Sequence, residues 1–228
     1  MRTALANLRT SLQRIRDITL DIDANALRAL QNRSTLEMHE TIQCATTVIV
    51  SGFFESFLKD VAEAFISVVT AKGIPFLKLP PKIQKTHFED GGAMVARKAR
   101  NRGETAWIMC TTHDLARRLG SVVTSVTYEI VWEAFADTKA NPGPENIRCF
   151  MQRFGIAKVW PKLASKAKVS ESLLITNLES YIRVRNECAH SGSALNIPTP
   201  NDVRDYCDQI DRLANAIVEV LEDHCASF

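Results

Sequence analysis

Two arginines, an asparagine and a histidine lie close together near the C-terminus of the chain. They are Arg183, Arg185, Asn186 and His190, within the stretch from Tyr181 to Gly192. Arginine is always charged and binds phosphate or carboxylate through a planar fork of donors. Histidine takes up and releases protons near neutral pH. A cation that holds phosphate charge and a base that moves a proton are the minimum needed to break a phosphodiester bond without a metal ion.

The spacing of these residues decides which of them can share a site, because the stretch has a helical pattern that Gly192 ends. Arg185 and His190 are five residues apart and point about 140° apart around an ideal helix. Arg183 and His190 are seven apart and point within about 20° of each other. Arg183 is therefore the better partner by geometry, unless the helix loosens before His190. Asn186, four residues before His190, could orient the imidazole or bind backbone at the helix end.

The run Arg185-Asn186-Glu187-Cys188-Ala189-His190 resembles the signature of the HEPN superfamily, in which an arginine and a polar residue precede a histidine. Two other segments are similar to the RiboL-PSP-HEPN branch, also called MAE-type HEPN-like nucleases. Residues 48–60 resemble its N-terminal helix, and residues 141–156 resemble the loop and helix before its motif helix. The resemblance covers most of the chain from about Thr35 onward.

This resemblance implies an all-α fold, an antiparallel helical bundle of HEPN type, and metal-independent endoribonuclease activity without a cofactor. In the implied mechanism the ribose 2′-hydroxyl attacks the phosphate and His190 moves a proton. Arg185, helped by Arg183, stabilises the developing charge. Arg185 comes first because the family shows the Arg-Asn pair. The resemblance also implies a homodimer that brings two motif helices to one cleft, and a role as a toxin or an anti-phage defence effector.

Two alternatives to a free-standing nuclease remain open from the sequence. The chain could be a non-catalytic helical dimer that acts as a binding or scaffold module, with the motif kept for structure. It could also be a toxin controlled by a partner nucleotidyltransferase. In the structural alternative, the arginines pair with Glu179 or Glu187 and His190 interacts favourably with the C-terminal end of its helix. The expected partners are RNA, a second copy of the chain, and an antitoxin or other regulatory protein.

Composition places the chain among ordinary globular proteins. It has 228 residues, 46% of them hydrophobic and 24% charged, and a formal net charge of +2. We therefore expect one domain over residues 1–228, with residues 75–140 as a variable helical insert, and RNA binding through local basic patches. The six cysteines form no CxxC pair. Without a signal peptide or a predicted membrane span, we expect a cytoplasmic protein with reduced cysteines.

Apolar residues recur at intervals of three and four along almost the whole chain, which predicts helices. The pattern of the first helix continues past a break predicted at residues 21–23. Proline and glycine near residues 73–81 and 141–144 predict loops. The predicted helices lie at 5–18, 42–69, 104–119, 122–135, 145–154, 170–190 and 201–225.

Three further sets of polar residues bear on function. Glu55 and Lys59 lie in the apolar helix at 42–69, where Glu55 could fix Arg183 or Arg185, or could simply pair with Lys59. A basic run is the best candidate for contacts with an RNA backbone, although such a run is more often a solvated helix face. His39, Glu37 and Glu40 alone supply too few ligands for a metal site, and we expect none. The basic run consists of Arg97, Lys98, Arg100 and Arg102.

Overall fold

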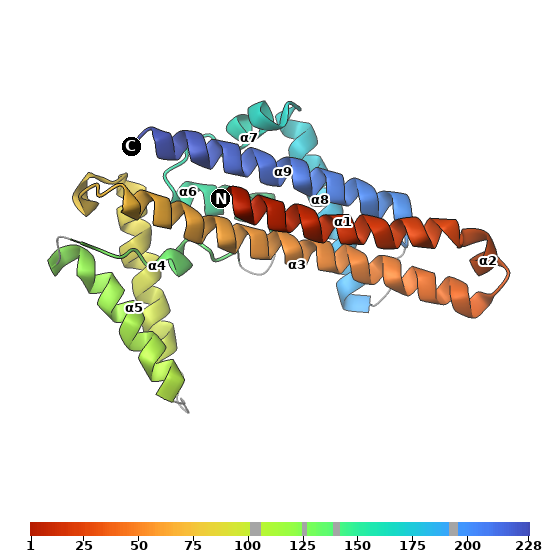
Figure 1. The fold of residues 1–228 in the computed structure, drawn as a ribbon, viewed down its shortest axis with the longest axis horizontal. Coiled ribbons are helices and arrows are strands. Elements are labelled where there is room, and N and C mark those ends of the chain that lie inside the picture. The colour runs from red at the N-terminus through yellow and green to blue at the C-terminus, as the bar shows by residue number, and fades with distance from the viewer. Residues whose placement is uncertain (101–105, 125–126, 139–141, 192–195) are drawn as a thin grey trace.

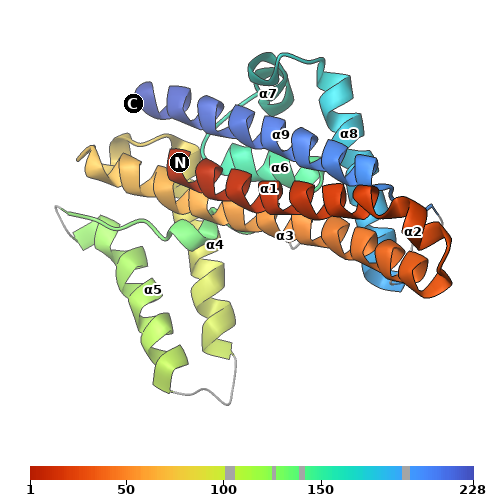
Figure 2. The same cartoon turned by 45° about the vertical axis from the view of Figure 1, so that its right-hand side comes forward.

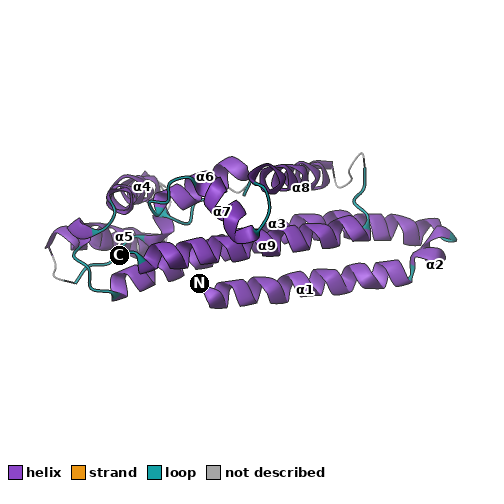
Figure 3. Ribbon diagram, turned by 90° about the horizontal axis from the view of Figure 1, so that it is seen from above, coloured by secondary structure: helices purple, strands orange, loops and turns teal. Residues whose placement is uncertain are grey.

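The structure of the chain, a computed structural model, describes residues 1–100, 106–124, 127–138, 142–191 and 196–228. Every regular element in these residues is a helix (Figure 3). The expectation of an all-α fold is therefore confirmed. Within these ranges, the side chains of residues 99–100, 106–111, 124 and 191 lie outside the described part.

Four long helices form the body of the molecule (Figure 1). They are α1 (Arg2–Ala24), α3 (Arg33–Ala71), α8 (Glu171–Ser191) and α9 (Pro200–Ala226). Helices α1, α3 and α9 contact one another, and α8 packs against α3. The short helix α2 (Ala26–Leu30) joins α1 to α3 at one end of the bundle.

Two other groups of helices are attached to this bundle. Helices α4 (Pro81–Arg100) and α5 (Ala106–Thr124) pack together and project from one side (Figure 2). Helices α6 (Pro144–Arg153) and α7 (Val159–Ala167) precede α8, and α7 packs on α9. Two short 3-10 turns, η1 (Phe76–Lys78) and η2 (Trp132–Ala134), flank the α4–α5 pair in sequence.

Helix α3 runs through the centre of the core. Phe54, Phe57, Val61 and Phe65 recur at intervals of three and four and are each at most 2% exposed. By length and hydropathy α3 could cross a membrane, since its most apolar window has a mean hydropathy of 1.3. Its buried face is covered by α1, α8 and α9, as in the core helix of a folded bundle. The expectation of a cytoplasmic, membrane-free protein stays a prediction.

Several of the predicted helices differ from the structure: α3 begins at Arg33 and not at residue 42, and α4 and α7 are absent from the prediction. The first helix does not break at residues 21–23 but continues to Ala24 and ends at Asn25. The predicted helix at 122–135 does not exist as one element: α5 ends at Thr124, and residues 128–131 are not helical. Polar groups of this segment form hydrogen bonds with other elements. Tyr128 donates to the Ile74 carbonyl at 2.6 Å, and the Val131 amide donates to His87 Nδ1 at 3.1 Å. Tertiary contacts override the helical spacing there.

His87 ties α4 to α5 and to the segment before η2. The side chain is fully buried; Nδ1 accepts from Val131, and Nε2 lies 3.3 Å from the Leu119 carbonyl, to which it donates in the neutral tautomer. Burial lowers the pKa of His87. Burial likewise lowers the pKa of His224, whose Nε2 lies 2.9 Å from the Phe154 carbonyl. Both histidines are thus held neutral in the fold.

Acidification should therefore destabilise the protein before its carboxylates titrate. Both folded pKa values lie below the ordinary value of 6.5, so the unfolded chain binds more protons as pH falls. The stability that these neutral rings contribute is complete above about pH 6.5 and falls below it, by at most about 1.4 kcal/mol per pH unit for each histidine. Urea unfolding at pH 7.5 and 5.5 measures this loss.

A test variant and a matched control each replace one histidine with glutamine. His87→Gln should flatten the pH dependence, whereas the same change at His113, which is exposed on α5, should leave it as it is. An equal slope in both variants would contradict the assignment of the loss to the buried ring.

Candidate active site

Helix α8 carries all four motif residues in one unbroken helix. It runs to Ser191, so the loosening before His190 that would let Arg185 reach around does not occur. Arg183, Asn186 and His190 therefore stay within about 60° of one another around the helix, whereas Arg185 points away from them. Arg183 and His190 are exposed and Asn186 is half-buried. The exposed face of α8 thus carries a cation and an imidazole, two helical turns or about 10 Å apart along the axis.

The opposite face of α8 packs against α3 in a seam of buried side chains. Tyr181 is 1% exposed, and its hydroxyl donates to the Thr47 carbonyl at 3.0 Å. Burial, with a smaller contribution from the Cys44 thiol beside it, raises the pKa of Cys188 to about 12. Cys188 is therefore a neutral packing residue inside the motif and not a nucleophile.

Arg185 connects this seam to the exposed face. Its Nη1 donates to Asn186 Oδ1 at 3.1 Å, which links Arg185 to a residue of the face that carries His190. Its Nε is buried and has no hydrogen-bond acceptor among the residues that the structure describes. A buried donor without a partner costs about 1–3 kcal/mol, and this cost falls if a bound anion supplies an acceptor.

Glu55 and Lys59 lie on α3, beside the seam. Glu55 is half-buried and Lys59 is exposed, and within the described part of the chain neither forms an ion pair, with each other or with Arg183 or Arg185. Burial raises the pKa of Tyr181 well above its usual value; Arg185 opposes this rise and Glu55 adds to it. Both charges therefore lie near the same phenol. A role of Glu55 in fixing an arginine stays a proposal.

Sequence reasoning missed two aromatic residues beside the motif. Tyr181 lies one helical turn before Arg185, and its ring centroid is 5.0 Å from that of Tyr206 on α9. Burial raises the pKa of Tyr206, and the charge of Arg183 opposes the rise, so Arg183 lies near that phenol. Each motif arginine thus has a tyrosine nearby. The spacing of Tyr181 and Arg185, four residues apart, is the only signal of this in the sequence.

The basic run in the middle of the chain is far from this site. Arg97 is exposed and Lys98 is half-buried near the end of α4, in the pair of helices that projects from the bundle (Figure 2). The Arg100 side chain and all of Arg102 lie outside the described residues. The structure therefore does not bring Arg97 or Lys98 to the motif, and contact of the basic run with RNA stays a prediction.

Acidic and metal-binding side chains do not gather at the motif. In the described part of the chain, no group of three or more His, Cys, Asp or Glu side chains is arranged to hold a metal ion. On the same surface, an exposed imidazole and the exposed guanidinium of Arg183 are residue types that suit proton transfer and the stabilisation of phosphate charge.

Comparison with known proteins yields one match. The family model described as RiboL-PSP-HEPN matches residues 11–223 of the chain. This span includes α3 and α8 in full, with the motif and the seam between them, and most of α1 and α9. No curated protein and no solved structure matches the chain significantly.

Proposed function

The chain belongs to the RiboL-PSP-HEPN family, and from this membership we propose that it is a metal-independent endoribonuclease. The observation that supports the proposal is the exposed face of α8, which carries Arg183 and His190 and to which Arg185 is linked by its hydrogen bond to Asn186. HEPN domains are often ribonucleases, and these residue types fit that chemistry. A role as a toxin or a phage-defence effector belongs to the same proposal.

In the proposed reaction, the 2′-hydroxyl of one ribose attacks the adjacent phosphate and forms a 2′,3′-cyclic phosphate. The P–O5′ bond breaks, and the 5′-oxygen leaves with a proton as a 5′-hydroxyl. His190 moves a proton in this exchange, and the guanidinium groups stabilise the charge that develops on the phosphoryl oxygens. DNA lacks the attacking hydroxyl and should not be cleaved.

The direct test is incubation of the purified protein with RNA in EDTA. We expect cleavage to persist, to leave 2′,3′-cyclic phosphate and 5′-hydroxyl ends, and to stop at a single 2′-deoxy substitution in a defined substrate. If EDTA abolishes cleavage while the helical circular dichroism signal persists, the metal-free mechanism is wrong. If RNA stays intact under all conditions, the scaffold alternative is favoured, because Arg185 packs in the seam as a structural residue would.

We also propose that the chain works as a homodimer, because the exposed motif on one α8 supplies a thin and open site. A composite site would take Arg183 from one protomer and His190 from the other. Mixed Arg183→Ala and His190→Ala protomers should then regain activity, because each mixed dimer holds one intact site. With random exchange this recovery is about a quarter of the wild-type rate.

Light scattering at micromolar concentration measures the oligomeric state in the same samples. A dimer without recovery on mixing would mean that each protomer holds a complete site of its own. A strict monomer with activity would rule out the composite site altogether.

A further inference from the structure

Positive charge is concentrated in the segment before the motif helix. Residues 147–170 contain six lysines and arginines and no aspartate or glutamate. Because the whole chain has a net charge of +2, the remaining residues sum to +2 − 6 = −4. This segment is therefore basic against an acidic background, and it includes α7 and both of its ends.

The two arginines of this segment have partners of their own. Arg148 pairs with Glu145 on the same helix, and Arg153 bonds to the carbonyl oxygens of Phe135 and Asp137 and lies near Asp90. These contacts neutralise them or bind them to other parts of the fold. The charge that remains to be explained is that of the four lysines around α7.

Three of these lysines are exposed and uncompensated. Lys158, Lys162 and Lys168 are exposed, and among the residues that the structure describes they form no ion pair. Lys166 alone is paired, with Asp223 of α9 at 2.6 Å. Lys158 and Lys168 hold left-handed backbone conformations at the two ends of α7, with φ of 51° and 56°. The lysine surface, defined as Lys158, Lys162 and Lys168, thus surrounds one short helix.

The surface groove between α7 and α9 suits a nucleic-acid phosphate backbone better than an apolar partner. Lys158 and Lys162 line a groove there together with Ser165, and the one carboxylate of its lining, Asp223, is paired with Lys166. Lysine ammonium groups and the Ser165 hydroxyl can donate to phosphate oxygens, whereas the Ser227 hydroxyl already donates to the His224 carbonyl. The apolar residues of α7, Val159 and Trp160, are buried and offer no anchor to a membrane or to an apolar peptide.

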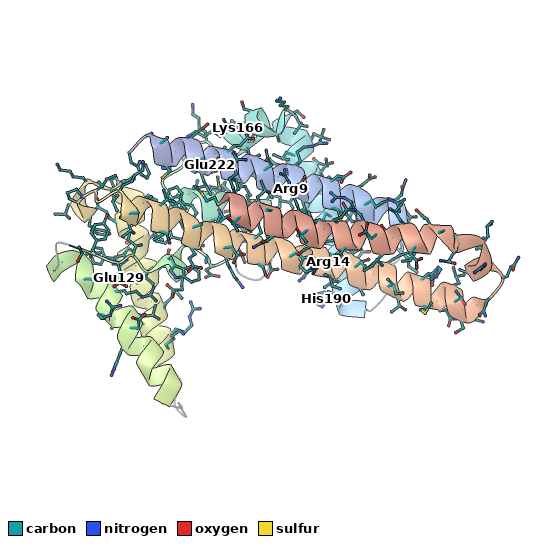
Figure 4. All side chains as sticks on the ribbon, viewed as in Figure 1. Arg9, Arg14, Glu129, Lys166, His190 and Glu222 are labelled. Atoms are coloured by element: carbon teal, nitrogen blue, oxygen red, sulfur yellow. The ribbon has the colours of Figure 1, made fainter. Side chains whose placement is uncertain are left out.

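We infer that the lysine surface binds the phosphate backbone of single-stranded RNA at a second place, apart from the motif. In Figure 4, Lys166 of α7 lies above the long helices and His190 lies below them. Lys168 and His190 lie before the start and near the end of α8, which spans about 30 Å. Only an RNA long enough to cover that distance can contact both. This inference rests on the proposed function, since it assigns RNA as the ligand.

The test measures RNA binding and not cleavage. In a His190→Ala background, Lys158, Lys162 and Lys168 are replaced with glutamine, and fluorescence anisotropy follows a labelled single-stranded RNA of about 30 nucleotides at several salt concentrations. Removal of one lysine–phosphate interaction should lower the slope of log affinity against log salt by about 0.7, and removal of all three should lower it by about 2. The matched control removes three other exposed cations, which form no ion pair with the residues that the structure describes, through Arg14→Gln, Arg28→Gln and Lys78→Gln.

A lower slope in the lysine variant alone supports the inference. An equal fall in both variants, or in neither, overturns it. Stronger lysine-dependent binding to phosphatidylserine vesicles than to RNA overturns the choice of ligand.

Cleavage assays keep this inference distinct from the proposed function. With histidine restored, the lysine variant should cleave a dinucleotide at the normal rate and a long RNA with a raised KM and an unchanged kcat. If the wild-type chain cleaves nothing while RNA binding depends on the lysines, the nuclease proposal fails and this inference stands. If the chain cleaves long RNA with no dependence on the lysines, this inference alone fails.

Discussion

Replacing His190 with alanine should lower RNA cleavage by about 10²–10⁴-fold, the range typical for loss of a general acid or base. The imidazole is the group on the exposed face of α8 that can give and take a proton near neutral pH. His190 is exposed, so its removal should leave the packing of α8 intact. The measurement is the initial rate on a defined RNA in EDTA, with the melting temperature of both proteins recorded.

The matched control is His113→Ala, which removes an exposed histidine from α5, outside the bundle that carries the motif. This variant should cleave RNA at the wild-type rate. A comparable loss in both variants would mean that the assay reports something other than His190. An unchanged rate in His190→Ala would remove the imidazole from the mechanism.

The helices of the bundle could be predicted because their burial is periodic. Leu5, Leu8 and Leu12 of α1 are each at most 3% exposed, and this is the stripe that the intervals of three and four predict. The stretch after Thr124 shows the same spacing of apolar residues, but residues 128–131 are not helical. There Tyr128 and Val131 are fixed by bonds to Ile74 and His87, which are distant in sequence. A periodicity argument cannot detect such partners.

The candidate site was predicted as a set of residues but not as an arrangement. The sequence places Arg183, Arg185, Asn186 and His190 on one helix, and the family match over residues 11–223 agrees with the resemblance that the motif suggested. It does not give the seam with α3, because Tyr181 and Thr47 are 134 residues apart in the chain. This seam decides which arginine is exposed and which is partly buried.

The two arginines should accordingly respond differently to substitution. Arg183→Ala should lower the cleavage rate by about 10²–10³-fold, the usual cost of removing one group that stabilises transition-state charge. Its melting temperature should not change, because Arg183 is exposed. Arg185→Ala should lower both the rate and the melting temperature, because Arg185 packs in the seam and donates to Asn186.

A double-mutant cycle between Arg185 and Asn186 shows how Arg185 acts. If Arg185 works by holding Asn186, then Asn186→Ala should cost as much activity as Arg185→Ala, and the double variant should lose little more. If Arg185 contacts the phosphate itself, its substitution should cost far more activity than that of Asn186.

Arg183→Lys should keep part of the rate that Arg183→Ala loses, since lysine keeps a positive charge without the planar fork. If Arg183→Ala cleaves normally while Arg185→Ala is inactive and fully stable, then the residue that holds the phosphate is Arg185, and α8 must turn in the active dimer to expose it.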